Sequence, residues 1–340
     1  MTAQNGGAHG AARGGATPGP PLVVRLATRG SPLALVQAAI VSGLLVDAAP
    51  GLVVERVVVR TVGDRRADVE LDRLGGQGAF AKEVQAAVLD GRADVAVHSA
   101  KDLPPETPPG LVLAAVPERA DPRDVLVGRT LAELPAGALV ATGSARRRAQ
   151  LANLRPDLTF VGLRGNMETR LDRARDGAVG AVVAAAAALD RLGRSDRIAE
   201  RLSVRRCLPQ VGQGALALEC RDDDGGGVRR LLDAVDVRGA HRALAAERAF
   251  LATLGAGCAV PAAAWAAPVQ PGGTRLVLRG LLASGDGRVV VRDELEGDDP
   301  DALGRALAEL LVTGRGGSSI EGWQDAVGSG GAAPAGSAPR

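Results

Sequence analysis

The strongest constraint on the fold is a regular alternation of strand-like and helix-like segments between residues 22 and 220. Alternation of this kind is typical of βαβ units with parallel strands. We expect strands at 22–28, 53–61, 93–100, 111–116, 138–142, 159–163, 178–185 and 215–220, and helices at 32–46, 79–89, 145–154 and 167–175. This part of the chain is therefore predicted to have an α/β fold. Because Tyr is absent and only three Phe are present, its core must consist of Val, Leu and Ala.

A different pattern begins near residue 240. A helix to about 254 precedes strands expected at 260–266, 275–283 and 288–294, and a helix at 302–312 follows. The Ser-Gly-Asp-Gly stretch at 284–287 is typical of a hairpin turn and would join the last two strands. This order predicts a small α+β domain.

The chain of 340 residues is longer than a single hydrophobic core usually supports, so several domains are expected. We predict a first α/β domain from 22–117 together with 215–234, a second from 122–208, and the α+β domain from 240–313. The strand at 215–220 would return to the first sheet. Residues 1–21 and 314–340 are predicted to be disordered tails, since 1–21 are rich in Gly, Ala and Pro and the C-terminal end is similar.

Charge and cysteine content exclude several classes of protein. With a net charge of +2, the chain lacks the large excess of basic residues that is typical of a nucleic-acid-binding protein. Its three Cys do not form a disulfide framework, and this indicates a reducing compartment. The longest apolar stretch, between Asp176 and Asp190, is too short to cross a bilayer, and residues 1–21 lack the hydrophobic core of a signal peptide. With three His and no Cys-x-x-Cys, a metal site is not expected. We expect a cytoplasmic protein with a small-molecule partner and neither nucleic acid nor membrane as a partner.

A Lys-Asp pair directly follows one of the predicted strands. Residues 95–104 read Val-Ala-Val-His-Ser-Ala-Lys-Asp-Leu-Pro, so the strand runs into Lys101 and Asp102 and stops at Pro104. Ligands of open α/β sheets bind outside the carboxyl ends of the strands, which would place this pair at a cleft. Only Lys82 and Lys101 are lysines among 41 basic residues. The alternative is an ordinary surface ion pair, and the neighbouring motifs favour a site.

Three strand-to-helix junctions share one design. Each has a helix-capping residue, Ser31, Ser144 or Asn166, close to at least one Arg. The junction arginines are Arg29, Arg146, Arg147, Arg148, Arg164 and Arg170. Free N–H groups at a helix start, together with a guanidinium, favour an anion. No Walker loop is present, so a polycarboxylate fits as well as a phosphate. For any one junction, ordinary capping with solvated arginines remains the alternative.

One of the three cysteines lies in a glycine-rich loop. Cys258 is part of Gly-Ala-Gly-Cys-Ala-Val-Pro at 255–261, where another molecule could reach the thiol. This makes Cys258 the candidate for a covalent role. Cys207 and Cys220 are more typical of small buried hydrophobic residues.

Taken together, these segments resemble the hydroxymethylbilane synthase family, whose members are also called porphobilinogen deaminases. The matching stretches occur in family order at 26–35, 93–104, 118–124, 163–166, 211–215 and 257–261. The resemblance covers roughly residues 22–312, and the ordered set is highly specific.

The resemblance implies a monomeric enzyme of three domains. Two would be α/β domains like those of periplasmic binding proteins, with the active site between them, and the third would carry Cys258. A dipyrromethane cofactor would be joined to Cys258 by a thioether and would prime the stepwise condensation of four porphobilinogen molecules, with loss of ammonia each time. Water would then release the linear tetrapyrrole hydroxymethylbilane.

The resemblance also implies roles for individual residues. Asp102 would act as general acid and base: it would protonate the leaving amine, stabilise the resulting cation and later take the pyrrole α-proton. Each pyrrole carries an acetate and a propionate, so the growing chain is a polycarboxylate. The residues expected to bind these carboxylates are Arg29, Ser31, Lys101, Ser144, Arg146, Arg147, Arg164, Arg170, Arg191 and Gln213. Gln77 and Phe80 would belong to a mobile loop.

The sequence departs from the family at two positions. Gly143 stands where Ser is common, which removes a hydroxyl from the second junction, and Gln77 stands where Lys is common, which weakens a loop contact to the substrate. On the residues alone, two other functions stay open. A solute-binding module would explain the junctions but would leave Asp102 and Cys258 without a purpose, and a ligand-sensing regulatory domain would need a DNA-binding partner region, which we do not find.

Overall fold

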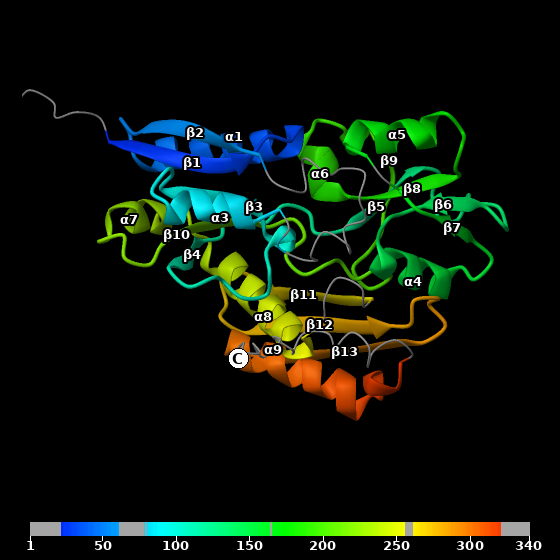
Figure 1. Ribbon diagram of the computed structural model, residues 1–340. Coiled ribbons are helices and arrows are strands. Elements are labelled where there is room, and N and C mark those ends of the chain that lie inside the picture. Colours follow the sequence, from blue (N-terminus) through cyan, green and yellow to red (C-terminus); the bar gives the residue numbers. More distant parts are fainter. Residues whose placement is uncertain (1–21, 61–77, 79, 164, 256–260, 321–340) are drawn as a thin grey trace, which may run out of the picture.

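Three sheets organise the chain into three units (Figure 1). The computed structural model describes residues 22–60, 78, 80–163, 165–255 and 261–320. Two five-stranded sheets with their helices lie side by side in Figure 1, and the three-stranded sheet lies below them. Within the described residues, no helix is both long and apolar enough to span a membrane.

The first unit is a mixed sheet with helices on both faces. Its strand order is β2–β1–β3–β10–β4, with β1 (Val23–Arg29), β2 (Val53–Val59), β3 (Val95–Ser99), β4 (Leu111–Ala115) and β10 (Leu216–Arg221). Its helices are α1 (Pro32–Ala48), α3 (Lys82–Leu89) and α7 (Gly227–Asp233). Side chains alternate along β1, so that Leu26 packs with Val41 of α1 while Ala27 packs with Val84 of α3.

The second unit repeats this topology. Its strand order is β7–β6–β8–β5–β9, with β5 (Asp124–Gly128), β6 (Leu139–Ala141), β7 (Thr159–Val161), β8 (Ala181–Ala185) and β9 (Ile198–Arg201). Its helices are α4 (Ala145–Leu154), α5 (Met167–Arg175) and α6 (Ala186–Arg191), with the 3-10 turn η3 (Ser195–Arg197). In both sheets the fourth strand, β10 or β5, runs antiparallel to its two neighbours.

These two antiparallel strands are the ones that follow a crossing of the chain between units. Residues 116–123 lead from β4 into β5, and residues 202–215 lead from β9 back into β10. The two crossing segments are hydrogen-bonded to each other, because Ala120 N donates to Gly214 O (3.2 Å) and Arg119 Nε donates to Gln213 O (2.9 Å). The chain therefore passes between the units through a paired connection.

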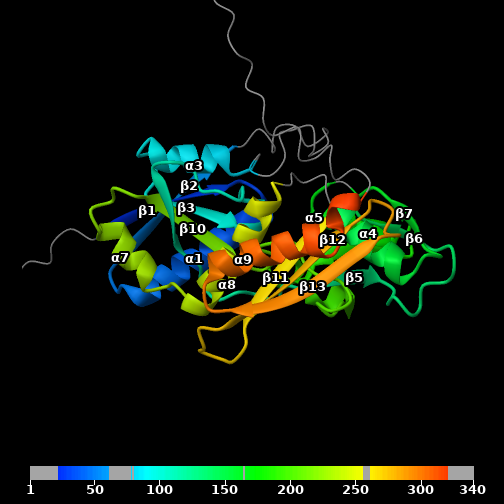
Figure 2. The ribbon, with the colours of Figure 1, turned by 90° about the horizontal axis from the view of Figure 1, so that it is seen from below.

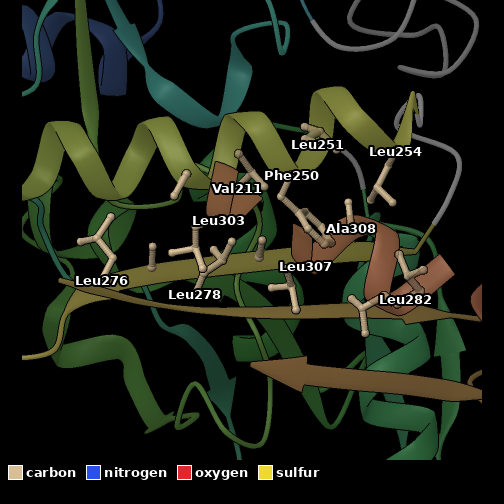
Figure 3. Close-up of a cluster of buried hydrophobic side chains, with 14 of the residues drawn as sticks. Val211, Phe250, Leu251, Leu254, Leu276, Leu278, Leu282, Leu303, Leu307 and Ala308 are labelled. Atoms are coloured by element: carbon tan, nitrogen blue, oxygen red, sulfur yellow. The ribbon is translucent and has the colours of Figure 1, made fainter. Parts of the chain in front are cut away.

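The third unit packs two helices on an antiparallel sheet. It comprises α8 (Arg238–Leu254), β11 (Ala262–Pro268), β12 (Leu276–Ala283), β13 (Val290–Gly297), α9 (Pro300–Glu309), the π-helical turn η4 (Leu310–Gly314) and the 3-10 turn η5 (Gly317–Ser319). Figure 3 shows Phe250 of α8, Leu278 of β12 and Leu307 of α9 in one cluster of buried side chains. Gly304 lets the two helices approach, since a Cβ there would lie 2.5 Å from Ala246 O.

The third unit contacts both of the others. Leu244 of α8 packs with Ala100 and Ala215 of the first unit, and Leu281 of β12 packs with Ala149 of α4. Figures 1 and 2 both show the end of β12 beside α4. The third unit therefore packs against both α/β units and connects them.

The structure confirms the predicted fold class, and the strand expected at 215–220 is β10, which does return to the first sheet. The hairpin turn is also confirmed: Gly287 N donates to Ser284 O (3.0 Å), and Ser284 N donates to Val289 O (2.9 Å). Cys207 and Cys220 are free and buried, as expected.

Four expectations need correction. The sheets are mixed rather than wholly parallel, because each receives a strand directly from a crossing segment. The strands β5 and β9 and the helices α6 and α7 were not expected. The last helix begins at Pro300 instead of 302, since the Asp299 side chain caps it by accepting from Ala302 N (2.9 Å). The expected tail from 314 is ordered at its start, where Ile320 is 5% exposed in the core of the third unit.

One buried carboxylate, that of Glu247 on α8, ties the third unit to the paired crossing segments. It accepts from Arg119 Nη1 and Nη2 (2.5 and 3.2 Å), from Gly212 N (2.7 Å) and from Ala266 N of β11 (2.8 Å). Glu247 is 0% exposed, so these donors have little access to water as a substitute.

We expect Glu247→Ala to lower the free energy of unfolding by roughly 3–5 kcal/mol, because it leaves two N–H groups of the mostly buried Arg119 guanidinium and two backbone amides without their acceptor. Chemical denaturation with far-UV circular dichroism measures this. The control is Glu296→Ala, which removes an exposed partner of Arg275 and should change the stability little. Equal effects of the two substitutions would contradict the role given to Glu247.

Candidate functional site

A pocket opens at the carboxyl ends of β1 and β3. These strands are parallel neighbours, so the loops that follow them meet at one edge of the sheet. The pocket is lined by Arg29, Ser31, Leu33, Ala34, Gln37, Phe80, Val97, His98, Ser99 and Asp102. Four of the predicted site residues, Arg29, Ser31, Phe80 and Asp102, therefore lie around one space.

Asp102 is held by a short, well-anchored turn. Directly after β3, residues Ala100–Asp102 form the 3-10 turn η2. Ala100 N donates to Ala215 O (3.0 Å) of the return crossing, and Leu103 is buried against the same segment. On the other side, Gln37 Nε2 of α1 donates to Ser99 Oγ (2.7 Å). The position of Asp102 thus depends on the first sheet, α1 and the return crossing.

The same pocket has a cationic wall. The Arg29 guanidinium carbon lies 4.0 Å from the centroid of the Phe80 ring, a cation–π distance. Ser31 caps α1 by accepting from Ala34 N (3.3 Å), as predicted, and Pro32 begins the helix. The start of α1, with its positive partial charge, therefore faces the same region as Arg29.

A fully buried pair lies on β3 and β10, behind the pocket. His98 Nε2 is 3.2 Å from Glu219 Oε2, and Gln85 Nε2 of α3 donates to the same oxygen (2.9 Å). Burial alone would raise the pKa of Glu219, but the interactions with His98, Gln85 and Arg248 together outweigh it and lower that pKa. Because His98 also lines the pocket, this carboxylate fixes the ring at the pocket wall.

A second cluster of predicted residues surrounds Asp124, the first residue of β5. Its carboxylate pairs with Arg146 Nη1 (2.7 Å) and Arg147 Nη2 (2.8 Å) and accepts from Gln213 Nε2 (2.9 Å) and Cys207 Sγ (3.4 Å). Burial opposes the charge on Asp124, but the two guanidiniums outweigh it and hold its pKa well below the usual range.

The two arginines of this cluster are buried as well. Arg146 is 5% exposed and Arg147 is 9% exposed. Arg146 Nη1 also donates to Leu208 O (2.6 Å), and Arg147 Nη1 donates to Val183 O (3.2 Å). Both guanidiniums are therefore engaged inside the protein, although the sequence analysis expected them to bind ligand carboxylates.

Lys101 lies between the two clusters. Burial lowers its pKa to about 8, and the nearby charges of Arg147 and Arg146 act in the same direction, whereas Asp102 and Asp124 act against it. The backbone carbonyl of Lys101 accepts from Gln210 Nε2 (3.2 Å) of the return crossing. The pKa of the ammonium group therefore depends both on Asp102 at the pocket and on the charges of the buried cluster.

The remaining predicted residues are placed near the Asp124 cluster or outside the described chain. Ser144 caps α4 by accepting from Arg147 N (3.4 Å), as predicted. Arg170 Nε donates to Gly165 O (2.8 Å), and its pKa is lowered by burial and by Arg147. Arg191 Nη2 donates to Gly214 O (2.8 Å). Gln77, Arg164 and Cys258 lie outside the described residues.

Sequence reasoning missed Gln37, His98 and Asp124 as parts of this region. Asp124 lies in the stretch 118–124 that contributed to the family resemblance, but no role in the site was assigned to it. A charged residue at the first position of a buried strand is a usable signal, because it needs a buried partner. Gln37 and His98 lie in apolar segments and carry no comparable signal.

The presence of glycine at position 143 has a steric explanation in this structure. A Cβ at this position would lie 2.8 Å from Leu163 O, which belongs to the third junction. The glycine therefore lets the second and third junctions approach, and a side chain here would require a shift of the backbone near 163.

Gly212 on the return crossing lies directly against the η2 turn. Its φ is +73°, and a Cβ would lie 2.8 Å from both Ala100 C and Lys101 N. The residue therefore needs both the left-handed conformation and the missing side chain.

We expect Gly212→Ala to displace the turn that holds Lys101 and Asp102 and to speed hydrogen exchange of the Ala100 amide. The matched control is Gly137→Ala, at φ +75° with no atom within 4 Å of the added Cβ. The control should lose about 1 kcal/mol of stability from the backbone conformation alone and leave that amide unchanged. Hydrogen exchange with mass spectrometry tests this, and unaltered exchange at Ala100 in Gly212→Ala would contradict it.

Two family models match the chain. Residues 24–227 match "Porphobilinogen deaminase, dipyromethane cofactor binding domain", and residues 242–313 match "Porphobilinogen deaminase, C-terminal domain". The two matched ranges correspond to the two α/β units and to the third unit.

Curated relatives agree over nearly their full length. Porphobilinogen deaminase of Syntrophus aciditrophicus is 43% identical over 307 residues, which cover 89% of this chain and 99% of that protein. The enzyme of that name from Roseiflexus sp. strain RS-1 is 49% identical over 292 residues, which cover 84% and 95%. Among solved structures, a TRAP periplasmic solute-binding protein from Desulfovibrio salexigens covers 64% of this chain and 73% of that chain at 13% identity, with a TM-score of 0.40. That likeness adds nothing to the strand orders described above, whereas the family models and relatives cover most of the chain. The chain belongs to the porphobilinogen deaminase family.

Proposed function

We propose that the chain condenses four porphobilinogen molecules, with loss of ammonia at each step, and releases hydroxymethylbilane, and that this chemistry takes place at the pocket of Asp102 and Arg29. The observation that carries the proposal is the juxtaposition of one carboxylate with a cationic wall at the ends of β1 and β3. Family membership favours this reaction over a solute-binding or regulatory role.

The residues of the pocket fit a dipyrromethane cofactor and the pyrrole substrate. Both are aromatic and carry several carboxylates, and the pocket combines the Phe80 ring with the Arg29 guanidinium and the start of α1. When bound, the cofactor supplies the pyrrole carbon to which the first substrate is joined. Arg29, Ser31 and Lys101 would bind acetate and propionate groups, because charge-assisted bonds to carboxylates are strong in a partly buried site.

The attachment of the cofactor to Cys258 belongs to this proposal. Its support is the position of Cys258 in the sequence, between the end of α8 at Leu254 and the start of β11 at Ala262. The helix α8 packs on the first unit through Leu244, and β11 is hydrogen-bonded to α8 because Ala266 N donates to Glu247 Oε1 (2.8 Å). Cys258 thus stands in the sequence between two elements that are bonded to each other.

Asp102 would carry the proton transfers. As an acid it would protonate the amine that leaves porphobilinogen, and as a carboxylate it would stabilise the cation that remains. After the new carbon–carbon bond forms, it would accept the proton lost from the pyrrole carbon. The turn η2 serves this role because it holds the carboxyl group in one place for both directions of transfer.

The proposal extends to the state of the protein. We propose a cytoplasmic monomer without a nucleic-acid partner, supported by the near-neutral charge of +2 and by the free thiols of Cys207 and Cys220.

Lys101 should give substrate binding a characteristic pH dependence. Its pKa of about 8 means that the ammonium is charged below pH 8 and is lost above it. We expect KM for porphobilinogen to rise about tenfold between pH 7 and pH 9, in proportion to the loss of the charged form. The control is Lys101→Arg, whose guanidinium stays charged, and its KM should stay nearly flat over this range. The same rise in both proteins would assign the titration to another group.

Substitution of Asp102 tests the function directly. We expect Asp102→Asn to lose about 10²–10⁴-fold in turnover, because the amide cannot transfer a proton, while the covalent cofactor is retained. Consumption of porphobilinogen and the intact mass of the protein measure the two properties. As a control, Cys258→Ser should lack the added mass of two pyrrole units. Wild-type protein without that mass and without turnover would refute the proposed function, and an active Asp102→Asn would refute the role of Asp102 alone.

A further inference from the structure

Asp124 holds a place in the site that the family resemblance does not assign. It is 0% exposed and accepts from two guanidiniums, an amide and a thiol. The guanidiniums belong to Arg146 and Arg147, both expected to bind ligand carboxylates. An internal carboxylate therefore already occupies the groups that a substrate carboxylate would use.

The charge balance of this cluster is unusual for a site that binds a polyanion. Arg146 and Arg147 are always charged, and one carboxylate between them leaves a net charge of +1. Lys101, within electrostatic range of all three, adds a further cation. Without Asp124, the three basic side chains of Arg146, Arg147 and Lys101 would have only Asp102, which acts on Lys101, as a nearby acidic group.

Asp124 also sits where the two units are connected. It follows the outgoing crossing directly, and Gln213 of the return crossing binds both Asp124 Oδ1 (2.9 Å) and Pro122 O (2.7 Å). Arg147 contacts the same Gln213 through Nη2 (3.4 Å). The carboxylate thus fixes the two arginines relative to the connection between the units.

A growing tetrapyrrole gains an acetate and a propionate with each added ring, and it must shift and finally leave. A cluster of uncompensated cations would bind every stage tightly, and tight binding of all stages slows the steps that follow. We propose that Asp124 is a positioning residue that acts as an internal competitor for substrate carboxylates, so that Arg146 and Arg147 bind the chain reversibly. This inference rests on the proposed function.

The test compares wild-type protein with Asp124→Asn, which keeps the shape of the side chain and removes its charge. We expect KM for porphobilinogen and kcat each to fall about tenfold, because substrate is held more tightly and the chain is released more slowly. Binding of citrate, a small tricarboxylate, measured by isothermal titration calorimetry, should tighten about tenfold as well.

The matched control is Asp121→Asn. Asp121 lies three residues earlier and also pairs with two arginines, Arg123 (2.7 Å) and Arg201 (2.7 Å), outside the cluster. It should lose some stability and keep the wild-type KM, kcat and citrate affinity. This control separates a charge at the site from the general loss of an ion pair.

If Asp124→Asn does not fold, the double variant Asp124→Asn/Arg146→Gln restores a net charge of +1. We expect it to fold and to lose the tighter binding, with citrate affinity and affinity for porphobilinogen no higher than in wild type. The inference would be overturned if Asp124→Asn bound citrate no more tightly than wild type and its KM did not fall. It would also be overturned if the double variant still bound citrate more tightly than wild type. An inactive wild type without a covalent cofactor would instead refute the proposed function.

Discussion

The pairing of buried opposite charges is the constraint on which the rest of this structure depends. Transfer of a guanidinium out of water costs several kcal/mol of free energy unless a carboxylate and other hydrogen-bond acceptors replace its hydration. Each buried pair must offset roughly this desolvation cost. Asp124 does this for Arg146 and Arg147, and Glu247 does it for Arg119. Arg119 and Glu247 lie 128 residues apart, so their pair also fixes the third unit against the crossing segments.

The sequence predicted the parts of the fold that depend on local chemistry. The caps at Ser31, Ser144 and Asn166 were identified because a side-chain oxygen satisfies N–H groups within the next turn, and the structure shows each bond. The α/β fold class and the return of β10 to the first sheet followed from the order of apolar segments. The strand β5 was not predicted. The antiparallel direction of β10 was not predicted either, because direction depends on how the chain enters the sheet after a crossing and not on the strand itself.

The partners of the site residues could not be predicted, for a related reason. Asp124 is 22 residues from Arg146 and 89 residues from Gln213, and no local pattern encodes such contacts. A junction arginine that lines a pocket and one that is engaged by a buried internal carboxylate both stand close to a helix-capping serine. Arg29 and Arg147 show these two outcomes at the first and second junctions.

Under the proposed function, the two clusters would have different roles in a site that binds a highly charged chain and also moves it. Around Asp102 the pocket is partly open, and Arg29 is stacked on Phe80 and can meet a ligand at the end of the first sheet. Around Asp124 the cations are saturated from within and are held at the connection between the units. Lys101 experiences both clusters and follows directly from the strand that ends at the pocket, so any change in the spacing of the two units alters the charges it faces. Electrostatics of the substrate chain and geometry of the connection are therefore coupled through one turn of backbone, residues 100–102, whose position depends on the close approach of Gly212.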